Sequence, residues 1–183
     1  MNRDETLILG IGNTLLTDEG AGIHALNHLQ SVYPDIRPDI TSLNFIDGGT
    51  LSFTLAVWIE DCANLIVFDA TELQQAAGTV NTFVGKAFDE FLGRAKHSAH
   101  EVGLIDLMDI ARLTDHLPKN RALIGIQPDK MGWGMQPTLA VANALDEAVN
   151  EAVKLIDRWQ KLGTNQEPSA PNAYSGKSRE VLR

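Results

Sequence analysis

The sequence contains a single cysteine, Cys62, among its 183 residues. One thiol excludes an intramolecular disulfide, argues against a closed structural zinc site and fits a reducing compartment. No apolar run approaches the roughly 20 residues that span a bilayer, and the first residues, MNRDETL, lack the apolar core of a signal peptide. We therefore expect a cytoplasmic protein with no membrane partner.

Basic residues are also scarce, with 15 Lys and Arg against 24 Asp and Glu and a net charge of −9. Phosphate contacts dominate the affinity of proteins for nucleic acid, so we do not expect this acidic chain to bind it. Its charge is better suited to a cation or a basic peptide.

The chain length fits one domain, because domains typically hold roughly 100–200 residues. The last residues, from Gly163 onward, are rich in Ser, Pro, Asn and Gly and lack apolar periodicity. We expect a single domain over 1–162 and a disordered tail over 163–183.

Strand-like and helix-like segments alternate along the domain. Apolar runs predict strands at 6–11, 40–46, 64–70 and 121–128, with a weaker antiparallel edge strand at 79–84. Helical periodicity predicts helices from about 18 to Pro34, around 51–59, at 101–115 and at 137–161. The inward face predicted for the last helix consists of Leu139, Ala142, Leu145, Val149, Val153 and Ile156. This order predicts an α/β fold, a three-layer α/β/α sandwich on a mostly parallel, twisted sheet.

A glycine-rich turn joins the first predicted strand to the first predicted helix, in the segment GIGNTLLTDEGAG from Gly10 to Gly22. Strand, tight turn and helix start are the geometry of a dinucleotide-binding fingerprint. However, Leu15 occupies the third glycine position, and Asp18 and Glu19 stand where phosphates would meet the helix N-terminus. Two carboxylates repel a phosphate and attract a cation. The alternative is that Asp18 caps the helix, with Glu19 in its first turn.

The carboxyl ends of parallel strands meet at one edge of a sheet, where ligands of such folds bind. Side chains that carry chemistry follow the predicted strands or precede the third helix: Glu19, Asp47, Asp69, His97, His100 and Trp133. Two carboxylates and an imidazole facing one crevice would make an open site for a borderline divalent metal. The ordinary alternatives are a turn cap for Asp69 and a solvated loop residue for His100.

Three other candidates receive a structural interpretation. Cys62 follows Asp61 at a helix end, which gives no means of activating the thiol, so we expect it to be buried and inert. His24 and His28 stand four residues apart without the glutamate of the zincin motif, so we expect a surface pair. The sequence has no G-x-S-x-G or Walker pattern.

Five segments together resemble the hydrogenase maturation endopeptidases: ILGIGNTLLTDEGAG, DGGTLSFTL, LIVFDA, HEVGLIDLM and LIGIQPD…GWGMQPTLAVANAL. They occur in order between Leu7 and about Val149, and their joint occurrence is highly specific. The resemblance implies removal of a C-terminal peptide from the large subunit of a nickel–iron hydrogenase once nickel is in place. It also implies the three-layer α/β/α fold.

The resemblance further implies the residues of the site. An acidic residue after the first strand, an aspartate after the third and a histidine before the next helix would bind metal, here Glu19, Asp69 and His100. His100 is preferred to His97 because it directly precedes the helix start GLIDL. The nickel would be carried by the substrate and held weakly by the free enzyme.

The chemistry implied is peptide hydrolysis, in which either nickel polarises the carbonyl or Glu19 or Asp69 acts as base; the sequence leaves both open. Gly48 and Gly49 follow the second strand and permit positive φ or close backbone approach, so we expect them to border a groove for an extended peptide. An ordinary turn is the alternative. Trp133, in the loop after the last strand, is the third expected substrate contact.

Two other functions are alternatives. A nucleotide-binding or hydride-transfer protein would rest on Gly10-x-Gly12 and on Asp47 at the end of the second strand. A nickel-binding chaperone would use the same metal ligands without hydrolysis. We expect the protease to act as a monomer, with the large-subunit precursor as its partner.

Overall fold

The structure is a computed structural model that describes residues 5–36, 43–94 and 99–164. Its strands are β1 (Thr6–Gly10), β2 (Leu43–Asp47), β3 (Asn64–Ala70), β4 (Val80–Val84) and β5 (Asn120–Ile126). Its α-helices are α1 (Ala21–Ile36), α2 (Ala56–Asp61), α3 (Lys86–Arg94), α4 (Ala99–Leu113) and α5 (Leu139–Thr164). Short 3₁₀ helices, η1 (Thr17–Gly20) and η2 (Phe53–Leu55), precede α1 and α2. Within these residues no helix has the length and apolarity to cross a bilayer.

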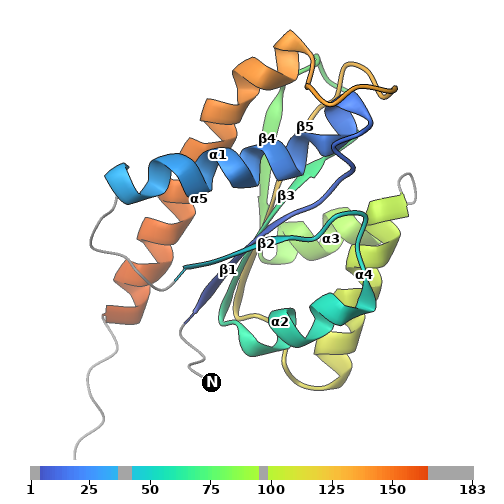
Figure 1. Ribbon diagram of the computed structural model, residues 1–183. Helices are drawn as coiled ribbons and strands as arrows, with labels where there is room; N and C mark the ends of the chain where they lie inside the picture. Colours follow the sequence, from blue (N-terminus) through green and yellow to red (C-terminus); the bar gives the residue numbers. More distant parts are fainter. Residues whose placement is uncertain (1–4, 37–42, 95–98, 165–183) are drawn as a thin grey trace, which may run out of the picture.

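The five strands form one sheet in the order β2-β1-β3-β5-β4 (Figure 1). Four strands are parallel, and β4 pairs antiparallel with β5 at the edge, with Val80 opposite Ile126. β1 is completely buried, and β3 is buried from Leu65 to Ala70, as expected for central strands covered on both faces. The predicted α/β class, the parallel sheet and the antiparallel edge strand are confirmed.

Helices cover both faces of the sheet, with α1 and α5 on one side and α2, α3 and α4 on the other (Figure 1). Side chains of β3 alternate between the layers. Ile66 and Phe68 join the core under α1 and α5, whereas Leu65 and Val67 join the core under α2, α3 and α4. This alternation determines which layer a functional side chain at the end of β3 faces.

The start of α1 lies directly against the ends of two strands. A Cβ atom at Gly22 would overlap the carbonyl oxygens of Ile11 and Phe68. A Cβ at Gly10 would lie only 2.7 Å from the carbonyl oxygen of Gly22 and 2.8 Å from Cβ of Leu26. Glycine at both positions therefore lets helix and sheet approach closely, which fixes where the chain entering α1 can lie.

Some sequence predictions were wrong in detail. Pro34 was predicted to end the first helix, but α1 continues to Ile36. In the last turn proline breaks only one helical hydrogen bond, so the helix runs on for two residues. The helix α3 was missed, because among its side chains that the structure describes only Phe88 and Leu92 are fully buried. It docks through Asp89, which accepts a 2.8 Å hydrogen bond from Nε of Arg121.

The last helix turns inward most of the predicted face, since Leu145 and Val153 pack against the core, but not its first part. Leu139 is 77% exposed and Ala142 is also exposed, while Val149 and Ile156 are buried as predicted. The buried face combines alanines with larger apolar side chains: Val141, Ala144, Ala148, Val149, Ala152, Leu155, Ile156 and Trp159. The three alanines allow α5 to pack closely on its neighbours. The helix also continues to Thr164, beyond the expected end at Lys161.

Candidate active site

At the carboxyl edge of the sheet, the turns after β1 and β2 are joined by their backbones. The amide of Gly12 donates to the carbonyl of Gly49 at 2.8 Å, and the amide of Gly48 donates to Gly10 at 2.8 Å. The carboxylate of Asp47 accepts from the amide of Gly49 at 2.8 Å. Gly49 has φ +50°, and no atom lies within 4 Å of a Cβ built there. The second turn is therefore an open rim whose shape depends on a left-handed glycine.

The glycine turn is not built to bind a phosphate. A Cβ at Gly12 would overlap the carbonyl oxygen of Glu19, so the chain itself fills the space beyond this glycine. Many amides of the turn already donate hydrogen bonds inside the protein. Those of Thr17 and Asp18 donate to Gly134 and Lys130, and others bonded within the chain belong to Gly12, Leu15, Leu16 and Glu19. The geometry argues against the nucleotide-binding alternative.

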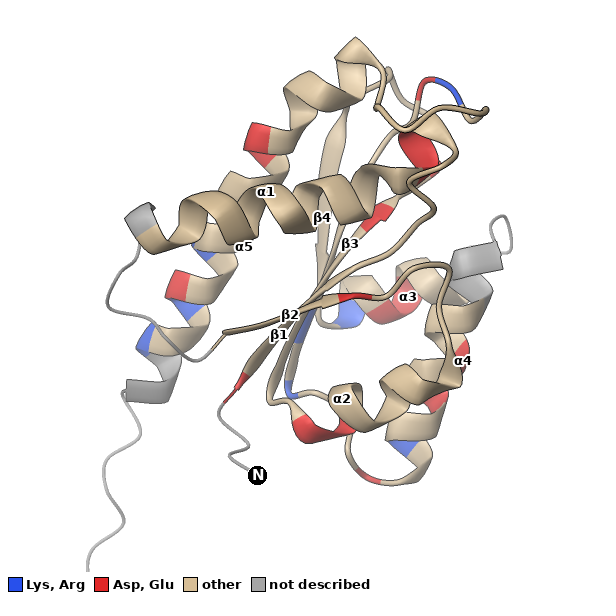
Figure 2. Cartoon of the chain, in the orientation of Figure 1, with Lys and Arg blue, Asp and Glu red and all other residues tan. Residues whose placement is uncertain are grey.

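Glu19 and Asp69 lie at the same edge. Glu19 lies in η1 and is half-buried, with Oε2 shielded from solvent. Asp69 is the penultimate residue of β3, only 1% exposed, with Oδ1 shielded. The turn η1 packs on β3, and Figure 2 shows the acidic segment at the end of β3 below the start of α1. Two carboxylates 50 positions apart in the sequence thus share one region of the fold.

The start of α4 reaches this edge as well. Asp69 has the same strand parity as Leu65 and Val67, which face the layer containing α4. A Cβ at Gly103 would lie 3.1 Å from Cδ1 of Leu51, so the early part of α4 contacts the chain that follows β2. His100 is the second residue of α4 (Ala99–Leu113), but its side chain lies outside the described residues.

His97 lies entirely outside the described residues. Within the part of the chain that the structure describes, no three His, Cys, Asp or Glu side chains are grouped so as to hold a metal ion. Of the three predicted ligands, only Glu19 and Asp69 have described side chains. Carboxylate oxygens with one imidazole nitrogen are a donor set that borderline divalent metals accept.

Asp18 has a role that the sequence did not reveal. Its carboxylate is fully buried and accepts hydrogen bonds from the amides of Asp129, Lys130 and Thr138 and from the Thr138 hydroxyl. Burial alone would raise the pKa of Asp18, but these hydrogen bonds outweigh it and hold the pKa below its ordinary value. The alternative that Asp18 caps the first helix is wrong, because its carboxylate accepts hydrogen bonds from Asp129, Lys130 and Thr138 instead. No sequence pattern links residue 18 to partners more than 110 positions away.

Thr17 binds the same loop in a strained conformation. Its φ is +46°, which is unusual for a β-branched residue. The Thr17 hydroxyl donates to the carbonyl of Lys130 at 2.6 Å and accepts from the amide of Gly132 at 3.1 Å. Such strain persists only where the surroundings enforce it, and it concentrates at functional sites.

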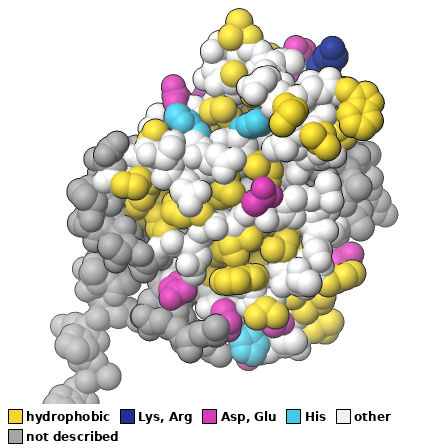
Figure 3. All heavy atoms as spheres, in the orientation of Figure 1, with side chains coloured by type: hydrophobic (Ala, Val, Ile, Leu, Met, Phe, Trp, Pro, Cys, Tyr) yellow, Lys and Arg dark blue, Asp and Glu magenta, His cyan; other side chains and the backbone are white. Residues whose placement is uncertain are grey.

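The loop after β5 exposes large apolar side chains. Trp133 is 86% exposed, and Met131, Met135 and Leu139 are also mostly exposed. Leu15, which lies across from this loop, is half-exposed. Figure 3 shows hydrophobic side chains gathered at the end of the molecule that carries the loop. Exposed apolar groups of this size are typical of binding surfaces.

The prediction that His24 and His28 form a surface pair on α1 is partly wrong. His24 and His28 are both half-buried, and Nε2 of His28 lies 2.7 Å from Oδ1 of Asp146 on α5. Nε2 of His24 is buried, and none of the described residues offers it a hydrogen bond. Burial lowers the pKa of His24, although the nearby charge of Asp18 opposes the shift. The pair therefore supports helix packing, with His28 bonded to Asp146 rather than free to bind metal.

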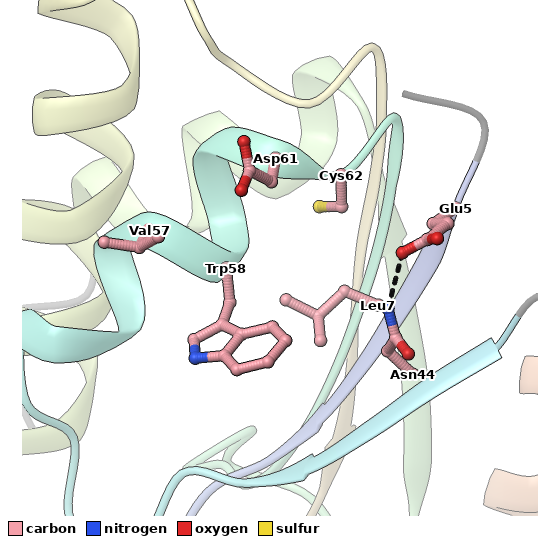
Figure 4. A pocket seen from close by; sticks show the side chains of 7 residues that line it. All are labelled: Glu5, Leu7, Asn44, Val57, Trp58, Asp61 and Cys62. Carbon is pink, nitrogen blue, oxygen red and sulfur yellow. Dashed lines mark hydrogen bonds between the residues drawn. The ribbon is translucent and has the colours of Figure 1, made fainter. Parts of the chain in front are cut away.

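A small hollow lies at the amino edge of the sheet, away from Glu19 and Asp69 (Figure 4). Trp58 and Cys62 line it, and Nδ2 of Asn44 donates to Glu5 at its rim at 2.7 Å. Burial raises the pKa of the Cys62 thiol to about 12, so the predicted inert, buried thiol is confirmed. Trp58 itself is about half-exposed.

Comparison with known proteins identifies the family. A family model described as hydrogenase maturation protease matches residues 23–155. The hydrogenase expression/formation protein HupD of Rhodobacter capsulatus is 33% identical over 159 residues, covering 85% of this chain and 73% of that protein. This chain belongs to the hydrogenase maturation protease family.

Solved structures support the same assignment. The hydrogenase maturating endopeptidase HybD from Escherichia coli matches with a TM-score of 0.76 at 25% identity, covering 84% of this chain and 93% of that one. The [NiFe] hydrogenase maturation protease HybD from Thermococcus kodakarensis matches with a TM-score of 0.68 at 28% identity, covering 82% and 98%. The three-layer fold of the hydrogenase maturation proteases is thus shared by this chain.

Proposed function

We propose that this protein removes a C-terminal peptide from the large-subunit precursor of a nickel–iron hydrogenase after nickel has been loaded. Membership of the hydrogenase maturation proteases supports the reaction class. The observation that carries the site is the meeting of η1 and β3, which brings Glu19 and the buried Asp69 to the carboxyl edge of the sheet. Ligands of open α/β sheets bind at this edge.

The proposed site recognises the nickel as part of the substrate. Glu19, Asp69 and His100 would contribute two carboxylates and an imidazole to the nickel of the precursor. Their donor chemistry fits a borderline divalent metal that other ligands, here those of the precursor, already hold. A precursor without nickel would lack this contact and would dock poorly.

Hydrolysis requires an activated water molecule and a polarised peptide carbonyl. Glu19 and Asp69 are the proposed bases, and a carboxylate that holds a water molecule near the scissile bond would remove its proton. Bound nickel would supply Lewis-acid polarisation of the carbonyl. The mechanism is aspartic-type if a carboxylate activates the water, and metal-dependent if nickel supplies the activation.

Contacts to the peptide are proposed at two places around the edge. The open rim at Gly49 would lie beside an extended segment of the precursor, since a side chain there would narrow it. Gly48 would support this rim, because a Cβ there would lie 2.9 Å from Cδ1 of Leu9 and only the bare backbone fits. The exposed ring of Trp133 would contact an apolar part of the precursor. We place the reaction in the cytoplasm, because a single free cysteine fits a reducing compartment. We propose that the protease acts as a monomer.

Cleavage of purified precursor tests this function directly. Precursor with and without nickel is incubated with the protease, and mass spectrometry measures loss of the C-terminal peptide. We expect cleavage of the nickel-loaded form only, and Glu19→Gln and Asp69→Asn should each lower the rate at least about a hundredfold. Asp109→Asn, on the exposed face of α4, controls for loss of one negative charge.

A nickel-binding chaperone would bind the same precursor without shortening it. An unchanged precursor mass with wild-type protein, under conditions in which the two proteins form a complex, would contradict the proposed hydrolysis. Equal cleavage of the nickel-free form would contradict the proposed recognition of nickel.

A further inference from the structure

We infer that Asp18 is a positioning residue. It holds the loop between β5 and α5, residues 127–138 (the Trp133 loop), in a fixed position relative to the turn that carries Glu19. The inference rests on the proposed function, because it assigns the loop to precursor binding and Glu19 to the reacting end. In the proposed reaction the side chain of Asp18 contacts neither the precursor nor the scissile bond. Asp18 acts only through the backbone of the loop.

The carboxylate of Asp18 connects both ends of the loop. Its Oδ2 accepts from the amides of Asp129 and Lys130, each at 2.9 Å, and from the Thr138 hydroxyl at 2.9 Å. Its Oδ1 accepts from the amide of Thr138 at 2.6 Å. One side chain therefore satisfies donors at the start of the loop and at the beginning of α5. Trp133 lies between these two attachment points.

Backbone contacts repeat the connection nearer to Trp133. The amide of Thr17 donates to the carbonyl of Gly134 at 2.7 Å, and the amide of Gly134 donates to Leu15 at 3.0 Å. The Thr17 hydroxyl adds bonds to Lys130 and Gly132. These contacts give the loop, although exposed, a defined position beside the turn that precedes Glu19. A preorganised loop loses less conformational entropy on binding than a mobile one.

Replacing Asp18 with asparagine should release the loop more than the turn. Asparagine keeps the shape of aspartate, but its NH₂ group donates hydrogen bonds and cannot accept those of the amides. Glu19 keeps its own supports, because its amide donates to Leu16 and its carbonyl packs against Gly12. We therefore expect Asp18→Asn to raise KM for nickel-loaded precursor about tenfold with kcat changed less than about twofold.

A double-mutant cycle separates positioning from general destabilisation. If Asp18 acts by presenting Trp133, then Trp133→Ala raises KM in the wild-type protein but adds little in the Asp18→Asn background. Asp129→Asn is the matched control, since it removes one negative charge from the same loop and leaves its backbone amide in place. Its KM should stay within about twofold of wild type.

Hydrogen exchange measures the coupling without reference to activity. In Asp18→Asn, the amides of Asp129, Lys130 and Thr138 should exchange at least about tenfold faster, while those of β3 stay protected. Thr138→Val, which removes only the hydroxyl donor, should produce a smaller change in the same direction and serves if Asp18→Asn does not fold.

The outcomes are distinguishable. Faster loop exchange together with non-additive KM effects supports the inference. Unchanged loop exchange, or KM effects that add fully, overturns it, even if precursor is cleaved as proposed. Failure of the wild-type protein to cleave precursor would instead overturn the proposed function, and unchanged KM in Trp133→Ala would overturn the role of the loop in binding.

Discussion

The amide of Gly12 donates a 2.8 Å hydrogen bond to the carbonyl of Gly49, which joins the turn after β1 to the turn after β2. Through this bond the open rim beyond β2 is fixed to the segment that leads into η1 and Glu19. Because Gly49 has φ +50°, the position of its carbonyl depends on a conformation that most residues avoid.

Gly49→Val should therefore slow precursor processing without unfolding the protein. A β-branched residue in the left-handed region costs roughly 1–2 kcal/mol, so the turn should rearrange and shift the rim. Gly49→Asn is the matched control, since asparagine tolerates this region. Cleavage rates and melting temperatures of both variants decide the matter. Equal processing by the valine variant would indicate an ordinary turn.

His100→Ala should abolish processing, whereas His97→Ala should leave most of it. Imidazole is mainly neutral at physiological pH and binds nickel better than water does, so its loss should weaken docking of the precursor. The assay is cleavage of nickel-loaded precursor, with the melting temperature as the measure of folding. A dead His97 variant with an active His100 variant would move the site to the other histidine. Normal cleavage by both would favour a protease that depends on Glu19 and Asp69 alone.

The free enzyme should hold metal weakly. The proposed ligands include no cysteine and would leave an open coordination shell, so purified protein should lose metal on dialysis against a chelator. Nickel, zinc or cadmium added afterwards should bind again, and Glu19→Gln should reduce that binding. Elemental analysis and calorimetric titration provide the measurements. Stoichiometric metal after dialysis would contradict the expectation.

Cys62 should make stability sensitive to alkaline pH. Its pKa rises from 9.0 to about 12 in the folded protein, so between these values the unfolded chain releases a proton that the folded chain keeps. The free energy of unfolding should therefore decrease as pH rises through this range, and the decrease should be smaller in Cys62→Ala. Denaturant titrations at pH 7 and pH 10 test this. The folded thiol should also react with alkylating reagents at least about a hundredfold more slowly than the unfolded one.

The sequence predicted the framework better than the connections within it. The run Asn64–Ala70 and the edge strand near Val80 could be located because continuous apolar runs and their turns are local signals. The inner face of α5 could be predicted only in part, because alanines take part of it while Leu139 stays in solvent. Local periodicity records where large apolar residues recur, and close helix packing can require small ones instead.

The candidate site divides in the same way. Glu19 and Asp69 could be proposed together because both follow strands of one parallel sheet, and the carboxyl-end rule applies to any such sheet. The function of Asp18 could not be predicted, since its partners at Asp129 and Thr138 become neighbours only when β5 and α5 are in place. Of these two adjacent acidic residues, the proposed role of Glu19 follows from the topology of the sheet. The role of Asp18 depends wholly on tertiary contacts.

The close approach of Gly22 to the ends of β1 and β3 gives this position an importance that no functional group provides. A methyl group there would meet two backbone carbonyls, at Ile11 and Phe68, and neither central strand has room to retreat. The helix would have to lift, and η1 with Glu19 would move with it. In a survey of random substitutions, Gly22 should tolerate replacement as poorly as Glu19 and Asp69 do. The reason would be the space that the helix needs to position Glu19, and not any chemical group of residue 22.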